Sequence, residues 1–379
     1  MAKNKEKKEL QQTYGEFKVT GKVVRIDSDK AYKQEVMQKG KNEGRPYRTL
    51  AFTVKTNEEN EVRVEMFAYE PKEVYLWNST KNKEAKERGE KYSGLRVSYE
   101  DWKENREEYE EQGYVVLESR LAVDYDEDGK LISKSQPAYL TAKELYNSLE
   151  NGDDVTVKGR LGHSKYTNQA GTEVKQTRYN IQQVYRNSKA IDFESDDFEE
   201  ISYFEDEVVF ISIDSDPDKK SRAILTGRTI DYSGNFVDNQ YILNLEEEGM
   251  KPLANNIRKR FKFGDKVRLF GDIINKAEVG EDEPLSEEDE FLLALGGKPR
   301  PKHSQRFTFK NYIQELEVGG VLKYEEGFYS EEDFMDTEKV KDETDKDLED
   351  FGGKKKPKKD DDDPFASDDD DFGDELPFW

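Results

Sequence analysis

Apolar and polar residues alternate along several short segments in the first half of the chain, which is the pattern of half-buried β-strands. Arg48–Lys55 and Glu61–Tyr69 alternate most regularly, and the four residues Asn57–Asn60 between them predict a hairpin turn. Further strands are predicted over Phe17–Asp27, Tyr114–Tyr125, Asp154–Leu161 and Thr177–Tyr185. The first half of the chain is therefore expected to be a β-rich unit.

The second half has a similar pattern. Strands are predicted over Ala223–Tyr232, Asn239–Leu245, Lys266–Ile274 and Arg306–Glu315. Met250–Phe263 has the spacing of an amphipathic helix. In the first half, Thr141–Leu149 predicts a short helix capped by Thr141, with Glu144 at the capping-box position. Lys81–Glu90 and Tyr99–Glu111 are helix-compatible but highly charged, so we expect them to hold little core.

A weak internal repeat relates the two halves. The matched segments are Gly21–Val24 with Gly227–Ile230, Gly152–Gly159 with Gly264–Gly271, and Tyr179–Gln183 with Asn311–Glu315. In each unit the predicted order is three strands, a helix and two more strands. This is the order of the OB-fold, a five-stranded Greek-key barrel. The fold class predicted is all-β, with two OB-folds in tandem and short helices.

The composition of the chain indicates which parts are folded and which are disordered. The hydrophobic fraction is 33% and the mean hydropathy −1.06, which predicts a sizeable disordered share. We predict that the chain has five parts: a flexible basic arm (1–12), a first OB-fold (13–188) with an insertion at about 71–150, an acidic linker (189–206), a second OB-fold (207–324) and a disordered acidic tail (325–379).

The charge is unevenly distributed. The net charge is −24, but the 55 residues Glu325–Trp379 hold 23 acidic and 8 basic residues. Local basic faces, rather than the net charge, decide whether a protein binds nucleic acid. Cysteine is absent, which excludes disulfides and thiolate metal sites. Without a long apolar run or a signal peptide, the chain is expected to be cytoplasmic and not to contact a membrane.

Aromatic and basic side chains share the polar faces of the predicted strands. Rings beside arginines on such a face can stack on bases, which is how sequence-tolerant single-strand binding works. The candidate contacts with single-stranded DNA are Arg45, Tyr47, Arg48, Arg63, Phe67, Tyr69, Lys158, Arg160, Lys165, Tyr166, Lys175, Arg178, Tyr179, Arg228, Tyr232, Phe236, Arg268, Arg306, Lys310 and Tyr312.

Other chemistry finds no support in the sequence. Asp124–Gly129 opens like a calcium-binding EF-hand loop, but Ser135 occupies the position of the bidentate glutamate, so an Asp-Gly turn between strands is expected. The two histidines, His163 and His303, lie in different units and are expected to be neither catalytic nor metal ligands. There is no phosphate-binding glycine loop. We therefore predict no catalytic residues, no cofactor and no metal, and a protein that is not an enzyme.

Two segments resemble bacterial single-stranded DNA-binding proteins. Gly152–Lys175 is similar to the hairpin between their fourth and fifth strands, and the tail resembles their acidic tip ending in Pro-Phe. The tip residues here are Asp374, Glu375, Leu376, Pro377, Phe378 and Trp379. Asp360–Phe365 is a near-copy. Because Trp379 follows the Pro-Phe and two OB units share one chain, the resemblance favours a phage-type relative.

The function that this resemblance implies is non-catalytic coating of single-stranded DNA in replication, recombination and repair. The tip would recruit replication or recombination proteins such as a polymerase, primase, helicase or recombinase. Two alternatives stay open. One is a nuclease or other DNA-processing subunit that grips its substrate with OB modules, and the other is an acidic interaction protein or DNA mimic that binds no DNA.

Overall fold

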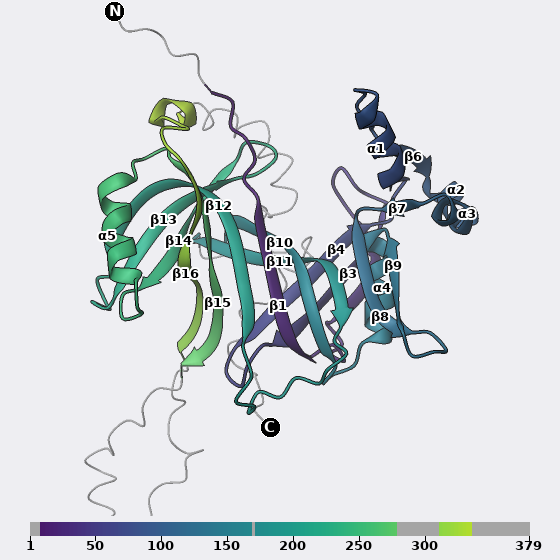
Figure 1. Cartoon of the computed structure of the whole chain (residues 1–379), viewed down its shortest axis with the longest axis horizontal. Helices are drawn as coiled ribbons and strands as arrows, with labels where there is room; N and C mark the ends of the chain where they lie inside the picture. Colours follow the sequence, from purple (N-terminus) through teal and green to yellow (C-terminus); the bar gives the residue numbers. More distant parts are fainter. Residues whose placement is uncertain (1–7, 169–170, 279–310, 336–379) are drawn as a thin grey trace, which may run out of the picture.

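The computed structural model describes residues 8–168, 171–278 and 311–335 and contains two five-stranded barrels with an insertion beside the first (Figure 1). Barrel 1 consists of β1 (Gly15–Val24), β3 (Pro46–Lys55), β4 (Glu61–Tyr69), β10 (Asp154–Thr167) and β11 (Glu173–Arg186), with helix α4 (Ala138–Ser148) before β10. Strand β1 pairs with β3 and β10, and β4 pairs with β11 in parallel at Asn180 and Glu65. This ring of pairings closes the barrel.

Barrel 2 repeats this arrangement. Its elements are β12 (Ile201–Ser215), β13 (Arg222–Ile230), β14 (Phe236–Asn244), α5 (Met250–Arg260), β15 (Lys266–Glu278) and β16 (Asn311–Glu325). Strand β12 pairs with β13 and β15, and the parallel contact joins β14 to β16 at Ile242 and Glu317. Strand order and helix position in both barrels are those of the OB-fold, which confirms the predicted fold class.

The first strands of the two barrels pair with each other. The antiparallel register of β1 with β12 runs from Gly15 opposite Asp206 to Thr20 opposite Ile201. One continuous sheet therefore passes through both barrels, and a single apolar core cluster includes Phe17 of β1 and Phe204 of β12. The barrels are built as one packed body.

A buried polar cluster lies where the barrels meet. His163 of β10 places Nε2 2.7 Å from Asp206 Oδ2, and Tyr241 of β14 donates its hydroxyl to the same oxygen at 2.5 Å. The other ring nitrogen of His163 lies 3.2 Å from the Thr177 hydroxyl. Burial, followed by the nearby Asp206 carboxylate, holds the pKa of Tyr241 well above its usual value, so this phenol stays protonated. His163 is thus part of the packing between barrels.

The duplicated Gly-Asp segment has the same local geometry in both barrels. Gly152 and Gly264 both adopt left-handed φ angles, 92° and 91°. The aspartate after each glycine accepts a hydrogen bond from the backbone N–H three residues before it, for Asp153 at 2.8 Å and for Asp265 at 2.7 Å. This part of the predicted repeat is confirmed.

The other two predicted matches were misaligned. Gly21 pairs with Val155 and Val208 pairs with Val267, so Val208, not Gly227, is the equivalent of Gly21. On the fifth strands, the residue opposite Gly159 is Ile181, whereas Val318 lies opposite Gly271. The Asn311–Glu315 match is therefore displaced along β16.

At Gly159 and Gly271 the backbones of the fourth and fifth strands of each barrel approach closely. A Cβ at Gly159 would lie 1.9 Å from the Asn180 carbonyl oxygen, and one at Gly271 would lie 1.8 Å from the Glu317 oxygen. We expect Gly159→Ala to lower the free energy of unfolding by about 3 kcal/mol, because the strands must move apart. Gly129→Ala, at a turn with no neighbouring atom within 4 Å, is the control and should cost about 1 kcal/mol. Equal losses in urea titrations of the two variants would contradict this packing.

The insertion between β4 and α4 has its own small core. Its elements are β5 (Glu73–Asn78), α1 (Ser79–Glu87), β6 (Leu95–Ser98), α2 (Tyr99–Glu104), α3 (Arg106–Glu111), β7 (Tyr114–Val116), β8 (Ser119–Tyr125) and β9 (Leu131–Gln136). Tyr99 and Trp102 of α2 are buried in it, so the expectation of little core was wrong for Tyr99–Glu111, whereas in Lys81–Glu90 the buried residue is Ala85 and the expectation is confirmed. The predicted Asp-Gly turn is confirmed: Asp126 caps the β8–β9 connection through Asp128 and Lys130 N–H groups. No helix in the described ranges is long and apolar enough to cross a membrane.

Several predicted elements differ from the structure. Helix α4 begins after Pro137, and Thr141 is buried inside it and bonded to Ser119, so it is not the cap. Strand β12 was missed and begins inside the segment expected to be a linker. Strand β16 runs on to Glu325, beyond the predicted Glu315. The remaining described elements are β2 (Tyr32–Val36), which pairs with β3, and a short 3-10 helix at Glu331–Phe334.

Candidate nucleic-acid interface

Three rings cluster on the outward side of β3 and β4. Leu50, Phe52 and Val54 of β3 belong to the core, so the alternate residues of the strand point outward. Tyr47 lies opposite Tyr69 across the strand pair and is 6% exposed, so it supports the half-buried rings of Phe67 and Tyr69, which are the two that can stack on bases. The ring centroid of Phe67 is 5.5 Å from that of Tyr47 and 4.9 Å from that of Tyr69. We call Tyr47, Phe67 and Tyr69, together with Arg45, the aromatic face.

Arg45 and Glu35 hold the aromatic face in place. The Arg45 guanidinium lies 4.7 Å from the Tyr69 ring centroid and donates to the Glu70 carbonyl oxygen. The Tyr47 hydroxyl donates to Glu35 Oε2 at 2.6 Å. Burial raises the pKa of Tyr69, against the opposing influence of an Asn42 hydrogen bond and of Arg45, so its phenol is neutral at physiological pH. Neutral rings with a fixed arginine can stack on bases without repelling phosphates.

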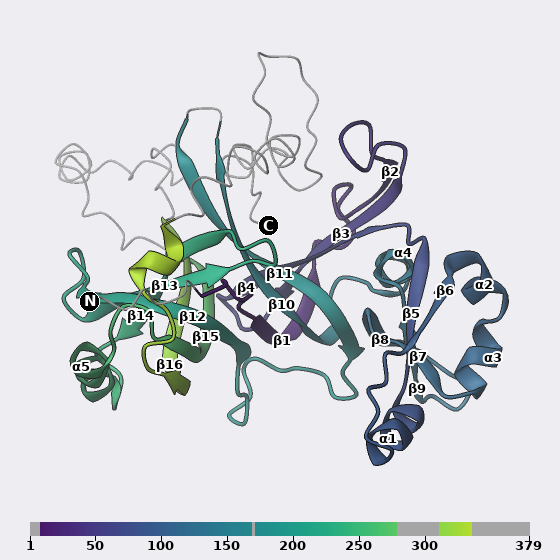
Figure 2. The same cartoon turned by 90° about the horizontal axis from the view of Figure 1, so that it is seen from above.

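Two hairpins border the aromatic face. Figure 2 shows the β10–β11 hairpin and the loop that carries β2 rising from the same side of the molecule. Counted within the five-stranded barrel, the loop that carries β2 connects the first and second strands, and the β10–β11 hairpin connects the fourth and fifth. In OB-folds these two connections and the faces of the second and third strands form the binding surface. Near the tip of β10–β11, Lys165 pairs with Glu173 at 3.2 Å and Tyr166 is 37% exposed. Lys175 donates to the Asp238 carbonyl oxygen of barrel 2 at 2.6 Å.

Two more predicted arginines lie beside the aromatic face. Arg63 is an exposed residue of β4, opposite Thr53 of β3. Arg178 of β11 places Nε 3.7 Å from Glu65 Oε1 and donates to the Gln176 side chain. The structure thus gathers Arg45, Tyr47, Arg63, Phe67, Tyr69 and Arg178 on neighbouring strands.

Two predicted contacts are buried in the packing of barrel 1. Arg48 is 8% exposed, donates to the Tyr139 carbonyl oxygen at 2.7 Å and lies 3.8 Å from the Tyr139 ring. Tyr179 packs edge-on against Phe17 with ring centroids 5.4 Å apart, and burial raises its pKa. Their side chains have structural roles, so we leave both out of the interface.

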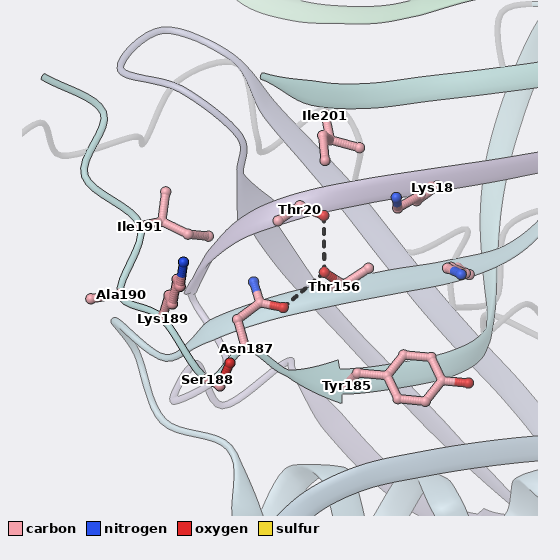
Figure 3. A pocket seen from close by; sticks show the side chains of 11 residues that line it. Lys18, Thr20, Thr156, Tyr185, Asn187, Ser188, Lys189, Ala190, Ile191 and Ile201 are labelled. Carbon is pink, nitrogen blue, oxygen red and sulfur yellow. Dashed lines mark hydrogen bonds between the residues drawn. The ribbon is translucent and has the colours of Figure 1, made fainter. Parts of the chain in front are cut away.

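Lys158 and Arg160 lie on another side of barrel 1. Their strand, β10, is separated from β4 by β11 in one direction and by β1 and β3 in the other. Arg160 lies 5.9 Å from the Tyr14 ring. Lys158 borders a groove together with Lys18, Tyr185 and Lys189, which the sequence analysis did not single out (Figure 3). The pairing of Lys18 with Lys158 across β1 and β10 could have been found only with the strand register.

In barrel 2 the structure describes the side chains of four predicted contacts, and three of them, Arg228, Phe236 and Arg268, are already engaged. Arg228 binds the Asp238 carboxylate with two nitrogens, at 2.6 and 2.9 Å, and lies 4.0 Å from the Phe236 ring and 4.7 Å from that of Phe334. Arg268 pairs with Glu205 at 2.7 Å. These side chains hold barrel 2 together rather than presenting a binding surface.

The outer side of β13 and β14 is covered at one end by a C-terminal segment. Phe334 and Tyr329 pack on Ile230, which is 2% exposed although it points outward from β13. Lys8 adds to this cover, since its backbone N–H donates to Asp333 Oδ1 at 2.8 Å. Tyr232, at 86% exposure, is the fully accessible predicted ring of barrel 2.

Some predicted site residues cannot be placed. Tyr312 lies on β16, but its side chain is outside the described part, as are Arg306 and Lys310. The predicted tip, Asp374–Trp379, also lies outside the described residues.

Comparison with protein families identifies the chain. The model of the YorF family matches residues 96–352, which is more than half of the 379 residues. The chain belongs to the YorF family. The match begins in the insertion of barrel 1 and runs through barrel 2, so the matched residues include both the β10–β11 hairpin and the second OB-fold.

Two solved structures are similar to this YorF-family chain, both of the single-stranded DNA-binding protein from Thermus aquaticus. The deletion mutant delta 228-252 R190A has 8% sequence identity and a TM-score of 0.35, over 83% of this chain and 96% of that chain. The wild-type protein has 9% identity and a TM-score of 0.31, over 83% and 92%. No curated protein matches the sequence.

Proposed function

We propose that this protein is a non-catalytic single-stranded DNA-binding protein that binds the strand on the aromatic face of barrel 1. The observation that carries the proposal is the placement of Tyr47, Phe67 and Tyr69, with Arg45 stacked on Tyr69, on the surface that OB-folds use for oligonucleotides. Each stacked base would contribute about 1–3 kcal/mol, with little dependence on its identity.

The two barrels would have different roles. Barrel 1 would grip the strand with the aromatic face, Arg63, Arg178 and the Lys165–Tyr166 hairpin tip. Barrel 2 would support that hairpin, because Lys175 is anchored on Asp238 of β14. The division of the chain into an arm, two OB-folds, a linker and a tail remains our proposal, with the start of barrel 2 moved to Ile201.

Recruitment of replication or recombination proteins by the C-terminal tip, and kinship with phage-type single-stranded DNA-binding proteins, stay predictions from the sequence. Deleting Asp374–Trp379 and comparing partner capture from a cell extract tests the first. A nuclease would show magnesium-dependent cleavage of the bound strand. A DNA mimic would show no binding to oligo-dT even at low salt.

Titration of the full chain with labelled oligo-dT over a salt series tests the proposed function. We expect binding of single strands in preference to duplex, with an affinity that falls as salt rises by a log–log slope of about 0.7 for each neutralised phosphate. An extrinsic label on the oligonucleotide suits this experiment, because Trp102 is buried in the insertion. Absence of binding at low salt would overturn the proposal.

Removal of Arg228 distinguishes the roles of the two barrels. We expect Arg228→Ala to lower the free energy of unfolding by about 2 kcal/mol, because Asp238 loses its two charged hydrogen bonds. Its affinity for oligo-dT should stay within about twofold of wild type. A tenfold weaker affinity with unchanged urea unfolding would instead place Arg228 in the interface.

A further inference from the structure

A groove with a basic lining crosses barrel 1 away from the aromatic face. It has a volume of about 500 Å³ and lies between β1, β10 and the segment 187–191 (Figure 3). Lys18, Lys158 and Lys189 line it, and no carboxylate does. In a chain with a net charge of −24, a lining of this kind selects for anions.

The three lysines are free to bind a ligand. Within residues 8–168, 171–278 and 311–335, none of the three has a carboxylate within ion-pair distance, whereas Lys22, further along β1, is paired with Asp154 at 3.1 Å. Lys18 and Lys158 are directly opposite each other on β1 and β10. Like charges at directly opposite positions of paired strands repel each other, and a bound anion would relieve that repulsion.

A chain of hydrogen bonds aims a further donor into the groove. Thr156 donates its hydroxyl to Asn187 Oδ1 at 2.9 Å, so the Thr20 hydroxyl, 2.9 Å from Thr156, is the donor to Thr156. The Asn187 amide oxygen is thereby occupied, and its Nδ2 turns into the groove (Figure 3). Among the described residues nothing accepts from this amide group, which therefore offers its N–H groups to a ligand oxygen.

The shape and the neighbours of the groove favour a chain of phosphates. The Tyr185 ring lines it, so a base could lie beside the backbone. Arg160 continues the line of cations on β10 two residues beyond Lys158, in the direction of the β10–β11 hairpin. Resting on the proposed function, we propose that the groove binds the phosphodiester backbone of the same single strand where it continues past the hairpin.

The test compares short and long oligo-dT. An oligonucleotide of about 8 nucleotides, within the range that one OB-fold covers, would occupy the aromatic face alone, whereas about 40 nucleotides would also reach the groove. The variants are the double substitution Lys18→Gln with Lys158→Gln, and Asn187→Asp, which replaces the N–H donors with a carboxylate. The control is Lys251→Gln with Lys259→Gln on the exposed side of α5, which changes the net charge by the same amount.

For the long oligonucleotide we expect the double variant to bind about tenfold more weakly than the control, with a salt slope smaller by about 1.4 for two lost phosphate contacts. Asn187→Asp should also weaken it, and the short oligonucleotide should bind all variants equally. If the variants bind the long oligonucleotide as tightly as the control does, the groove does not bind the strand, and the proposed function stays intact. An equal loss of affinity for the short and the long oligonucleotide would also contradict the proposal, because the groove would then be part of the primary binding site. Failure of the proposed function looks different, since wild type would then bind neither length.

Discussion

Phe67→Leu is expected to weaken oligo-dT binding by about 5- to 160-fold, the equivalent of one lost stacking partner at 1–3 kcal/mol. Phe67 is the best residue for this test because its side chain has no polar group, so the substitution removes a ring and no hydrogen bond. Leucine keeps most of the apolar volume beside Tyr47 and Tyr69 and should leave the barrel folded. The measurement is fluorescence anisotropy of a labelled oligonucleotide at fixed salt.

Two companion variants make the Phe67 result specific. Phe67→Tyr retains the ring and should bind like wild type. Tyr125→Ala removes a 49% exposed ring at the end of β8 in the insertion, and it should leave affinity unchanged. If Phe67→Leu binds as tightly as Phe67→Tyr, the aromatic face does not stack on bases. The salt slope should be the same in all three variants, because no phosphate contact is altered.

Asp206→Ala should give the largest loss of stability, about 3–5 kcal/mol of unfolding free energy. The substitution removes the shared acceptor of His163 and Tyr241 and leaves two buried polar groups without a partner, each costing about 1–3 kcal/mol. Because these three residues come from β10, β12 and β14, the loss falls at the junction of the barrels. Urea unfolding should show one cooperative transition in wild type and a lower midpoint in the variant.

Two controls separate the junction from a general effect of charge. Tyr241→Phe removes one hydroxyl and keeps the ring, so it should cost about 1 kcal/mol. Asp218→Ala, in the exposed loop before β13, should change the unfolding free energy by less than about 0.5 kcal/mol. If Asp206→Ala is no more destabilising than Asp218→Ala, the polar cluster does not hold the barrels together.

Much of the fold could be predicted because the strands of barrel 1 alternate regularly. Leu50, Phe52 and Val54 are core residues as their spacing indicated. The Gly-Asp segments revealed the duplication because a left-handed turn requires a glycine in each copy. Strand β12 escaped detection because the charged run Glu205–Glu207 interrupts its apolar pattern. In the structure Asp206 faces the junction between barrels, where His163 and Tyr241 satisfy it.

The binding site was harder to predict than the fold. The polar faces of different strands have similar sequences. The role of an arginine on such a face depends on its interaction partner, which can be far away along the chain. Arg48 is occupied by Tyr139, 91 residues away, and Arg228 is enclosed by Phe334. Conversely, the sequence pattern of β1 indicates its core residues but not Lys18, because the groove forms only when β1, β10 and segment 187–191 come together.

Photocrosslinking can locate the bound strand on the protein. Oligo-dT carrying 5-iodouridine is irradiated in complex with the full chain, and crosslinked peptides are identified by mass spectrometry. We expect crosslinks to Phe67 or Tyr69 on the aromatic face of barrel 1, and their disappearance when unlabelled oligo-dT is in excess. Crosslinks confined to barrel 2, with none on β3 or β4, would contradict it.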